Sequence, residues 1–155
     1  MIKKLIRWFW NMIYGELDEV EVKQFFDRFA NVFELSNYLM ANGYEWRSDG
    51  ENILPYYKFD GFERPGQVLA RKWANCSGWL RLYSEFIRYK RCADRLEECL
   101  LHNGPIGAWH YCSLIQDRGV TYIQSNMSVT ILDKPLLELY KDKYKNMEMI
   151  AVWEK

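Results

Sequence analysis

The chain has 155 residues, which is enough for one domain with a sizeable core and too few for two ordinary domains. Apolar residues make up 49% of the chain and charged residues 27%, a composition that excludes intrinsic disorder, collagen-like repeats and coiled-coil rods. The 21 Lys and Arg residues balance the 21 Asp and Glu residues. Because proteins that bind nucleic acid by neutralising phosphates are usually basic, we expect no nucleic-acid partner.

The start of the chain and its cysteines indicate a compartment. Charges at Lys3, Lys4 and Arg7 interrupt the first apolar run, so we expect no signal peptide. No stretch approaches the roughly 20 apolar residues of a membrane span. No two cysteines have the C-x-x-C spacing, since they lie at Cys76, Cys92, Cys99 and Cys112. We therefore expect a cytoplasmic protein with reduced thiols.

Residues 2–14 have the spacing of an amphipathic helix. At 100° per residue, the residues that fall within one arc of roughly 100° are Lys3, Lys4, Arg7 and Asn11. Apolar side chains occupy the rest, which predicts either a helix docked on the core of the domain or a weak contact with a membrane surface or a partner. In the second interpretation the basic arc faces anionic headgroups. Residues 1–15 form this N-terminal segment.

Three further helices are predicted before the strands begin. Residues 16–40 start with carboxylates, which favour a helix N-terminus, and continue with apolar residues at helical spacing up to a stop signal at Asn42-Gly43. A second helix covers residues 75–90, with Asn75 as its N-cap. Its expected buried face consists of Leu80, Tyr83, Phe86 and Ile87. The third predicted helix covers residues 93–101.

The second part of the chain has the pattern of strands. Residues 109–124 predict a β-hairpin with its turn at Gln116-Asp117-Arg118-Gly119. Residues 44–66 predict an irregular connection with one short strand. The last expected elements are a strand at 129–132, a short charged helix at 135–146 and a strand at 149–153. Helices followed by antiparallel strands are typical of the α+β class, so we expect N-terminal helices packed on a small antiparallel sheet.

Cys76 is the cysteine best placed for chemistry, because it lies in the first turn of the helix predicted after Asn75. Unpaired N–H groups and the positive end of the helix dipole favour a thiolate there. The small residues Ser77 and Gly78 leave room for a substrate carbonyl beside the sulfur. The alternative is that Cys76 is a small buried hydrophobic residue.

His110 is the expected base for this nucleophile. It begins the first hairpin strand, where the alternation of side chains turns its imidazole to the same side as Cys112. A third residue should orient the ring through its other nitrogen. Gln124 and Asn126 offer that group from the second hairpin strand, and both lie on one face if the strand extends that far.

The order Cys76, His110, Asn126 resembles the Cys-His-Asp/Asn triad of the transglutaminase-like cysteine peptidases, a branch of the papain-like superfamily. Residues 64–71 resemble the Pro-x-x-x-Leu lead-in of that family. Three more stretches are similar to family motifs: 76–83 to its Cys-Asp-x-Ala/Tyr helix, 109–115 to its His-Ala-Trp strand and 122–126 to its Trp-x-x-x-Asp strand. Tyr122 replaces that Trp, and Asn126 replaces the Asp.

The resemblance implies a papain-like fold with the catalytic core in residues 60–155, acting on amide bonds of a protein or peptide substrate. The implied site residues are Cys76 as nucleophile, His110 as base and Asn126 as the group that holds the ring, with the backbone N–H of Cys76, helped by Trp73 or Gln67, stabilising the oxyanion. Water or an amine would then resolve the thioester. The alternative is a catalytically inactive scaffold of the same family that binds a protein.

We expect no metal and no cofactor. The gaps between the five residues that could bind zinc match no common finger or ribbon pattern: Cys92, Cys99, His102, His110 and Cys112. Cys92 and Cys99 are expected on one face of a helix, in the core, and His102 at that helix's C-terminal end. The sequence contains no P-loop, Rossmann fingerprint or H-E-x-x-H motif. Paired carboxylates such as Glu97-Glu98 are interpreted as a solvated helix face.

Overall fold

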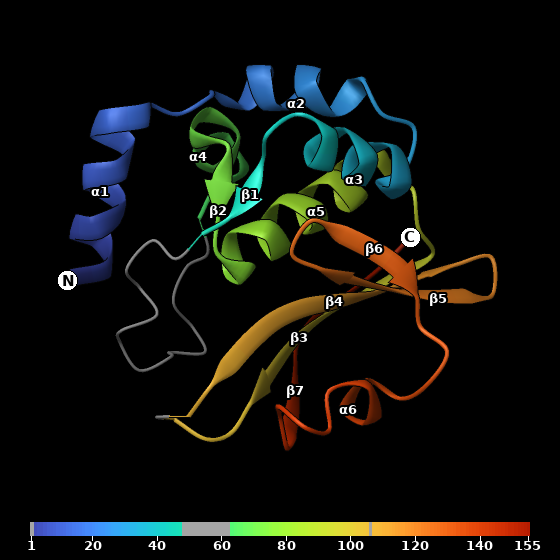
Figure 1. Cartoon of the computed structure of the whole chain (residues 1–155). Coiled ribbons are helices and arrows are strands. Elements are labelled where there is room, and N and C mark those ends of the chain that lie inside the picture. The colour runs from blue at the N-terminus through green and yellow to red at the C-terminus, as the bar shows by residue number, and fades with distance from the viewer. Residues whose placement is uncertain (1, 48–62, 106) are drawn as a thin grey trace.

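The structure, a computed structural model, describes residues 2–47, 63–105 and 107–155 and has the expected α+β class (Figure 1). Its helices are α1 (Ile2–Tyr14), α2 (Glu19–Asp27), α3 (Val32–Ala41), α4 (Pro65–Arg71), α5 (Cys76–Lys90) and α6 (Leu136–Leu139). Its strands are β1 (Glu45–Trp46), β2 (Trp73–Ala74), β3 (Arg95–His102), β4 (Trp109–Asp117), β5 (Val120–Ser125), β6 (Ser128–Ile131) and β7 (Asn146–Glu154). In Figure 1, α2 to α5 lie above the main sheet and α6 lies below it.

The N-terminal region forms three helices where the sequence predicted two. Helix α1 covers the predicted residues 2–14, and it contacts α4. The prediction of one helix over 16–40 is wrong, because the helix is interrupted between the end of α2 and the start of α3. Asn31 caps the new helix: its side-chain oxygen accepts hydrogen bonds from the backbone N–H groups of Phe33 and Glu34, both at 3.0 Å. A capping box between Asp18 and Glu21 starts α2.

Helix α5 is the central helix of the fold, and its prediction is confirmed. Asn75 is the N-cap, and its side-chain oxygen accepts a hydrogen bond of 3.0 Å from the N–H of Gly78. The expected buried face is fully buried: Leu80, Tyr83, Phe86 and Ile87. The helix ends at Arg91, which takes a left-handed conformation with φ 51°.

The main sheet has five antiparallel strands in the order β6-β5-β4-β3-β7. The predicted hairpin is confirmed as β4 and β5, which pair from Asp117 with Val120 to Cys112 with Ser125. Arg118 and Gly119 form its turn with φ values of 49° and 78°. A separate pair of two-residue strands, β1 and β2, runs parallel next to the start of α5.

Residues 93–101 do not form the predicted helix. They contribute to β3, which lies inside the sheet and pairs with β4 on one side and β7 on the other. Cys92 and Cys99 therefore share no helix face, and His102 ends a strand. Glu98 is buried rather than solvated, and its carboxylate accepts a hydrogen bond of 3.0 Å from Arg88. Pairing on both edges outweighs the helix propensity of this Leu- and Glu-rich stretch.

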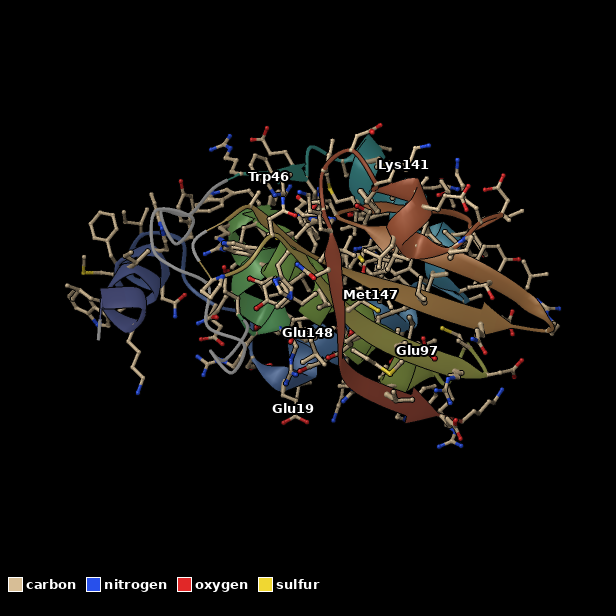
Figure 2. All side chains as sticks on the ribbon, turned by 90° about the horizontal axis from the view of Figure 1, so that it is seen from below. Glu19, Trp46, Glu97, Lys141, Met147 and Glu148 are labelled. Carbon is tan, nitrogen blue, oxygen red and sulfur yellow. The ribbon has the colours of Figure 1, made fainter. Side chains whose placement is uncertain are left out.

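The C-terminal region follows the predicted order with changed lengths. Strand β6 matches the predicted strand at 129–132 within one residue, whereas the helix predicted over 135–146 is reduced to the four residues of α6. Strand β7 starts earlier than the predicted strand at 149–153 and forms one edge of the sheet. Figure 2 shows this strand from below, with Met147 and Glu148 along it.

The two faces of the sheet carry different cores. The α5 face contains Leu96, Leu100, Tyr111 and Ile115, packed with residues of α5. The opposite face packs against α6 and the segment after it, through Cys99, Leu101, Cys112, Ile123 and Leu136. Over the described parts of the chain, no helix combines the length and the apolar content required to cross a membrane.

Candidate active site

Cys76 is the first residue of α5, directly after the N-cap Asn75. The Ser77 hydroxyl donates a hydrogen bond of 2.7 Å to the Asn75 side chain, which fixes the cap. Gly78 is required by packing, because a Cβ there would lie 2.8 Å from the Cβ of Ala74. These contacts hold the sulfur at the N-terminal end of the helix, where the helix dipole favours negative charge.

A buried ion pair supports the segment that leads to Cys76. Arg71 of α4 contacts the Glu63 carboxylate, and both side chains are almost fully buried. Arg71 also donates a hydrogen bond of 2.7 Å to the backbone carbonyl of Trp73, and its guanidinium lies 4.1 Å from the centre of the Trp73 ring. The Glu63 carboxyl carbon would lie 3.6 Å from a Cβ on Gly78, which places the pair beside the first turn of α5.

His110 lies in β4, and aromatic side chains surround its imidazole. The ring stacks on Tyr144 at 6.3 Å between centroids and with an interplanar angle of 16°, and Tyr140 lies at 6.0 Å. Its Nε2 atom is 2.9 Å from the Ser125 hydroxyl oxygen. The Tyr140 hydroxyl donates to the same Ser125 oxygen over 3.3 Å. The imidazole is therefore held on the α6 side of the sheet.

Cys76 approaches the sheet from the other face, where it packs with Leu80, Leu100 and Tyr111. The two residues nevertheless line one pocket of about 320 Å³, at the end of the sheet where β4 begins and β5 ends. The residues that line it are Trp46, Cys76, Gly107, Ala108, Trp109, His110, Asn126 and Tyr144. The structure thus brings Cys76, His110 and Asn126 to a common pocket.

The hydrogen bond of the His110 ring goes to Ser125 rather than to Asn126 or Gln124. Asn126 takes a left-handed conformation with φ 50°, and its buried Oδ1 atom has no hydrogen-bond partner among the described residues. Gln124 is fully buried on the α5 side and accepts a hydrogen bond of 2.8 Å from Ser113. Its amide also donates to the backbone carbonyl of Asn126 over 2.7 Å, which fixes the turn after β5.

Ser125 is the functional candidate that the sequence analysis missed, although a signal for it was present. In the antiparallel hairpin Cys112 pairs with Ser125, so even-numbered residues of β4 share a face with odd-numbered residues of β5. His110 and Ser125 therefore point to one side of the sheet, and Gln124 points to the other. The tyrosines around the ring come from the segment after α6, and no local pattern links that segment to β4.

The electrostatics of the pocket favour a neutral imidazole. Burial, and then the positive charge of Lys143, lower the pKa of His110 to about 4. Burial, and then the nearby Cys76, raise the pKa of Tyr144. Near neutral pH, the His110 ring is thus uncharged.

The other three thiols are poor nucleophiles by their surroundings. Burial raises the pKa of Cys92 to about 11 and the pKa of Cys99 to about 12, and it raises the pKa of Cys112 as well. None of the four cysteines forms a disulfide bond. Neither Trp73 nor Gln67, the expected helpers of the oxyanion site, is among the described residues that line the pocket.

In the described ranges, no group of three or more His, Cys, Asp and Glu side chains is arranged to hold a metal ion. Cys92, Cys99, His102, His110 and Cys112 therefore form no such group. Comparisons of this chain with protein-family models, with curated proteins and with solved structures find no match.

Proposed function

We propose that the chain is a cysteine-dependent hydrolase or acyltransferase that acts on amide bonds of a protein or peptide, from a papain-like, transglutaminase-like core at residues 60–155. The observation that carries the proposal is the shared pocket, which is lined by a cysteine at the start of α5 and by a histidine from β4. A thiol needs a nearby base to become a nucleophile, and an uncharged imidazole is such a base.

In the proposed reaction, a ring nitrogen of His110 takes the thiol proton while the Cys76 sulfur forms a bond to the amide carbonyl carbon. The backbone N–H groups in the first turn of α5 stabilise the oxyanion. The carbon–nitrogen bond then breaks, and His110 returns the proton to the leaving amine, which leaves a thioester on Cys76. Attack by water releases a carboxylic acid and the free thiol, and attack by an amine forms a new amide instead.

For the ring to accept that proton, its other nitrogen must carry the hydrogen. Ser125 is placed to accept it, because Nε2 lies 2.9 Å from the Ser125 oxygen. This leaves Nδ1 with a free electron pair. We therefore propose Ser125 as the group that orients the ring, with Asn126 as a further residue that lines the pocket.

A second function has a specific observation in its favour. A pKa of about 4 for His110 and a hydroxyl rather than a carboxylate beside it disfavour the imidazolium that forms during catalysis. A scaffold of the same family that lacks activity and binds a protein in the same pocket fits these features. The free thiols fit a cytoplasmic location for either function.

The proposal predicts that Cys76 is the most reactive thiol of the chain and that its reactivity depends on His110. We expect iodoacetamide, with each cysteine followed by mass spectrometry, to label Cys76 at least tenfold faster than Cys92 at neutral pH. The pKa of Cys92 is about 11, two units above the ordinary value of 9.0, which reduces its thiolate about a hundredfold. His110→Ala should slow the labelling of Cys76 roughly tenfold or more.

The same measurement separates the two functions. Cys92, Cys99 and Cys112 serve as internal controls, and their rates should be unchanged in the His110→Ala variant. If Cys76 reacts no faster than these three thiols, or if its rate is indifferent to His110, the enzyme proposal fails and the binding scaffold is favoured. If both expectations hold, amide libraries with mass-spectrometric detection of the thioester on Cys76 identify the substrate class.

A further inference from the structure

Helix α1 presents an apolar face that the rest of the described chain leaves uncovered. Five of its side chains are between 45% and 62% exposed: Leu5, Trp8, Phe9, Met12 and Ile13. They recur at three- and four-residue spacings, so they form one stripe along the helix. In Figure 1 and Figure 2, α1 lies at the end of the molecule, away from the main sheet. A stripe of this size on a short helix is an interaction site rather than a part of the core.

The helix is nevertheless attached to the body in one orientation. The rings of Trp10 and Tyr14 pack edge-on against Trp73, with centroids 5.0 Å and 6.0 Å apart. At the end of α1, the backbone N–H of Leu17 donates to the carbonyl of Gly66 over 3.1 Å. The neighbouring Arg64 makes two hydrogen bonds to the Glu16 carboxylate, at 2.6 and 2.8 Å. One flank of α1 is therefore fixed to α4 and β2, and the apolar stripe faces outward.

The positive charge of residues 1–15 indicates which kind of partner the apolar stripe of α1 can bind. The first fifteen residues contain Lys3, Lys4 and Arg7 and no acidic residue, although the whole chain has no net charge. The sequence spacing assigns these basic residues to the arc opposite the stripe, and Lys4 is exposed. A helix with a bulky apolar stripe that includes Trp and Phe, and with basic residues on its opposite arc, matches the boundary between headgroups and acyl chains in an anionic membrane.

We propose that α1 binds the surface of an anionic lipid bilayer and lies in the plane of the interface. The stripe enters the acyl boundary, and the basic residues contact the headgroups. The thirteen residues of α1 give a reversible contact, because neither the length nor the charge allows it to span the bilayer. Trp73 is three residues before Cys76, so the same docking holds the segment that leads to the pocket near the membrane.

The test is co-sedimentation of the full-length chain with vesicles. We expect binding to vesicles of phosphatidylcholine with phosphatidylserine, and much weaker binding to phosphatidylcholine alone. The double variant Trp8→Ala/Phe9→Ala should lose at least tenfold in affinity, since these side chains are exposed and contribute apolar burial only in the bound state. The variant Lys3→Gln/Lys4→Gln/Arg7→Gln should bind about as weakly to anionic vesicles as wild type binds to neutral ones.

Ile131 provides a matched control, because it is 66% exposed on the edge strand β6, far from α1 in the sequence. The variant Ile131→Ala should bind anionic vesicles like wild type. The proposal is overturned if wild type does not sediment with anionic vesicles, or if it binds neutral vesicles equally and the basic residues are without effect. It is also overturned if sedimentation velocity shows a dimer that Trp8→Ala/Phe9→Ala dissociates, because α1 would then be an interface between copies of the chain.

Discussion

The imidazole of His110 is held by the hydroxyl group of Ser125, and the importance of this contact can be tested with a single substitution. Ser125 contacts both the ring nitrogen of His110 and the Tyr140 hydroxyl. We expect Ser125→Ala to slow the labelling of Cys76 about fivefold, the equivalent of roughly 1 kcal/mol for one lost hydrogen bond. The measurement is the iodoacetamide rate at Cys76, together with the tautomer of His110 by nitrogen NMR.

Asn126→Gly is the matched control for this change. Glycine tolerates the left-handed backbone of Asn126, so the variant removes the amide without straining the turn. It should leave the His110 tautomer and the Cys76 rate in place, because the hydrogen bond of the ring goes to Ser125 and the Asn126 amide oxygen has no hydrogen-bond partner among the described residues. The opposite result, with Asn126→Gly slowing Cys76 and Ser125→Ala without effect, would assign the orienting role to Asn126.

The depressed pKa of His110 also predicts how stability depends on pH. The pKa is about 4 in the folded protein against an ordinary value of 6.5, so the unfolded chain binds a proton that the folded chain rejects. The favourable contribution of neutral His110 is complete above the unfolded value and disappears as the pH falls toward 4. The difference corresponds to about 3 kcal/mol of unfolding free energy.

Urea unfolding at a series of pH values measures this contribution. We expect the stability of wild type relative to His110→Gln to fall by about 3 kcal/mol between neutral pH and about pH 4, because glutamine does not titrate. His102→Gln is the companion variant, since it keeps His110 and should retain the wild-type loss. Parallel curves for wild type and His110→Gln would show that the folded protein does not hold the imidazole neutral.

At the scale of elements, local signals predicted the parts of the fold that depend on local physics. Helix α5 has an N-cap at Asn75 and apolar residues at helical spacing, and both signals lie within the helix itself. The β4–β5 hairpin is similar, since alternating apolar residues border a turn with Gly119. Cys76 lies in the first of these elements and His110 in the second. For this reason the two residues could be predicted as a candidate pair from the sequence.

The elements that the sequence analysis missed depend on contacts distant in the chain. Strand β3 has Leu and Glu residues that favour a helix, and only its two neighbours in the sheet make it a strand. Helix α6 is short because the chain after it turns back to pack Tyr140 and Tyr144 against His110. Ser125 is a different case, because its contact with His110 does follow from a local pattern. The register of the β4–β5 hairpin and the alternation of side chains place both residues on the same side of the sheet.

At the scale of the whole molecule, the buried ion pair of Arg71 and Glu63 connects α1 with the start of α5. The buried Arg71 side chain contacts Glu63 and donates a hydrogen bond to the backbone carbonyl of Trp73. The Trp73 ring in turn packs against Trp10 of α1. Glu63 lies beside Gly78 in the first turn of α5. Removing one member of a buried pair leaves the other charge without its partner inside the protein, which costs about 3–5 kcal/mol.

We therefore expect Arg71→Met to lower the unfolding free energy by about 3–5 kcal/mol, and the melting temperature by roughly 10 °C. Arg64→Met is the matched control, because the Arg64–Glu16 pair is largely exposed and such pairs contribute about 1 kcal/mol or less. Calorimetry of both variants measures the difference. Equal, small shifts would mean that the Glu63–Arg71 pair contributes no more than a surface ion pair. A large shift for Arg71→Met, accompanied by slower labelling of Cys76 in the folded variant, would show that this pair also positions the start of α5.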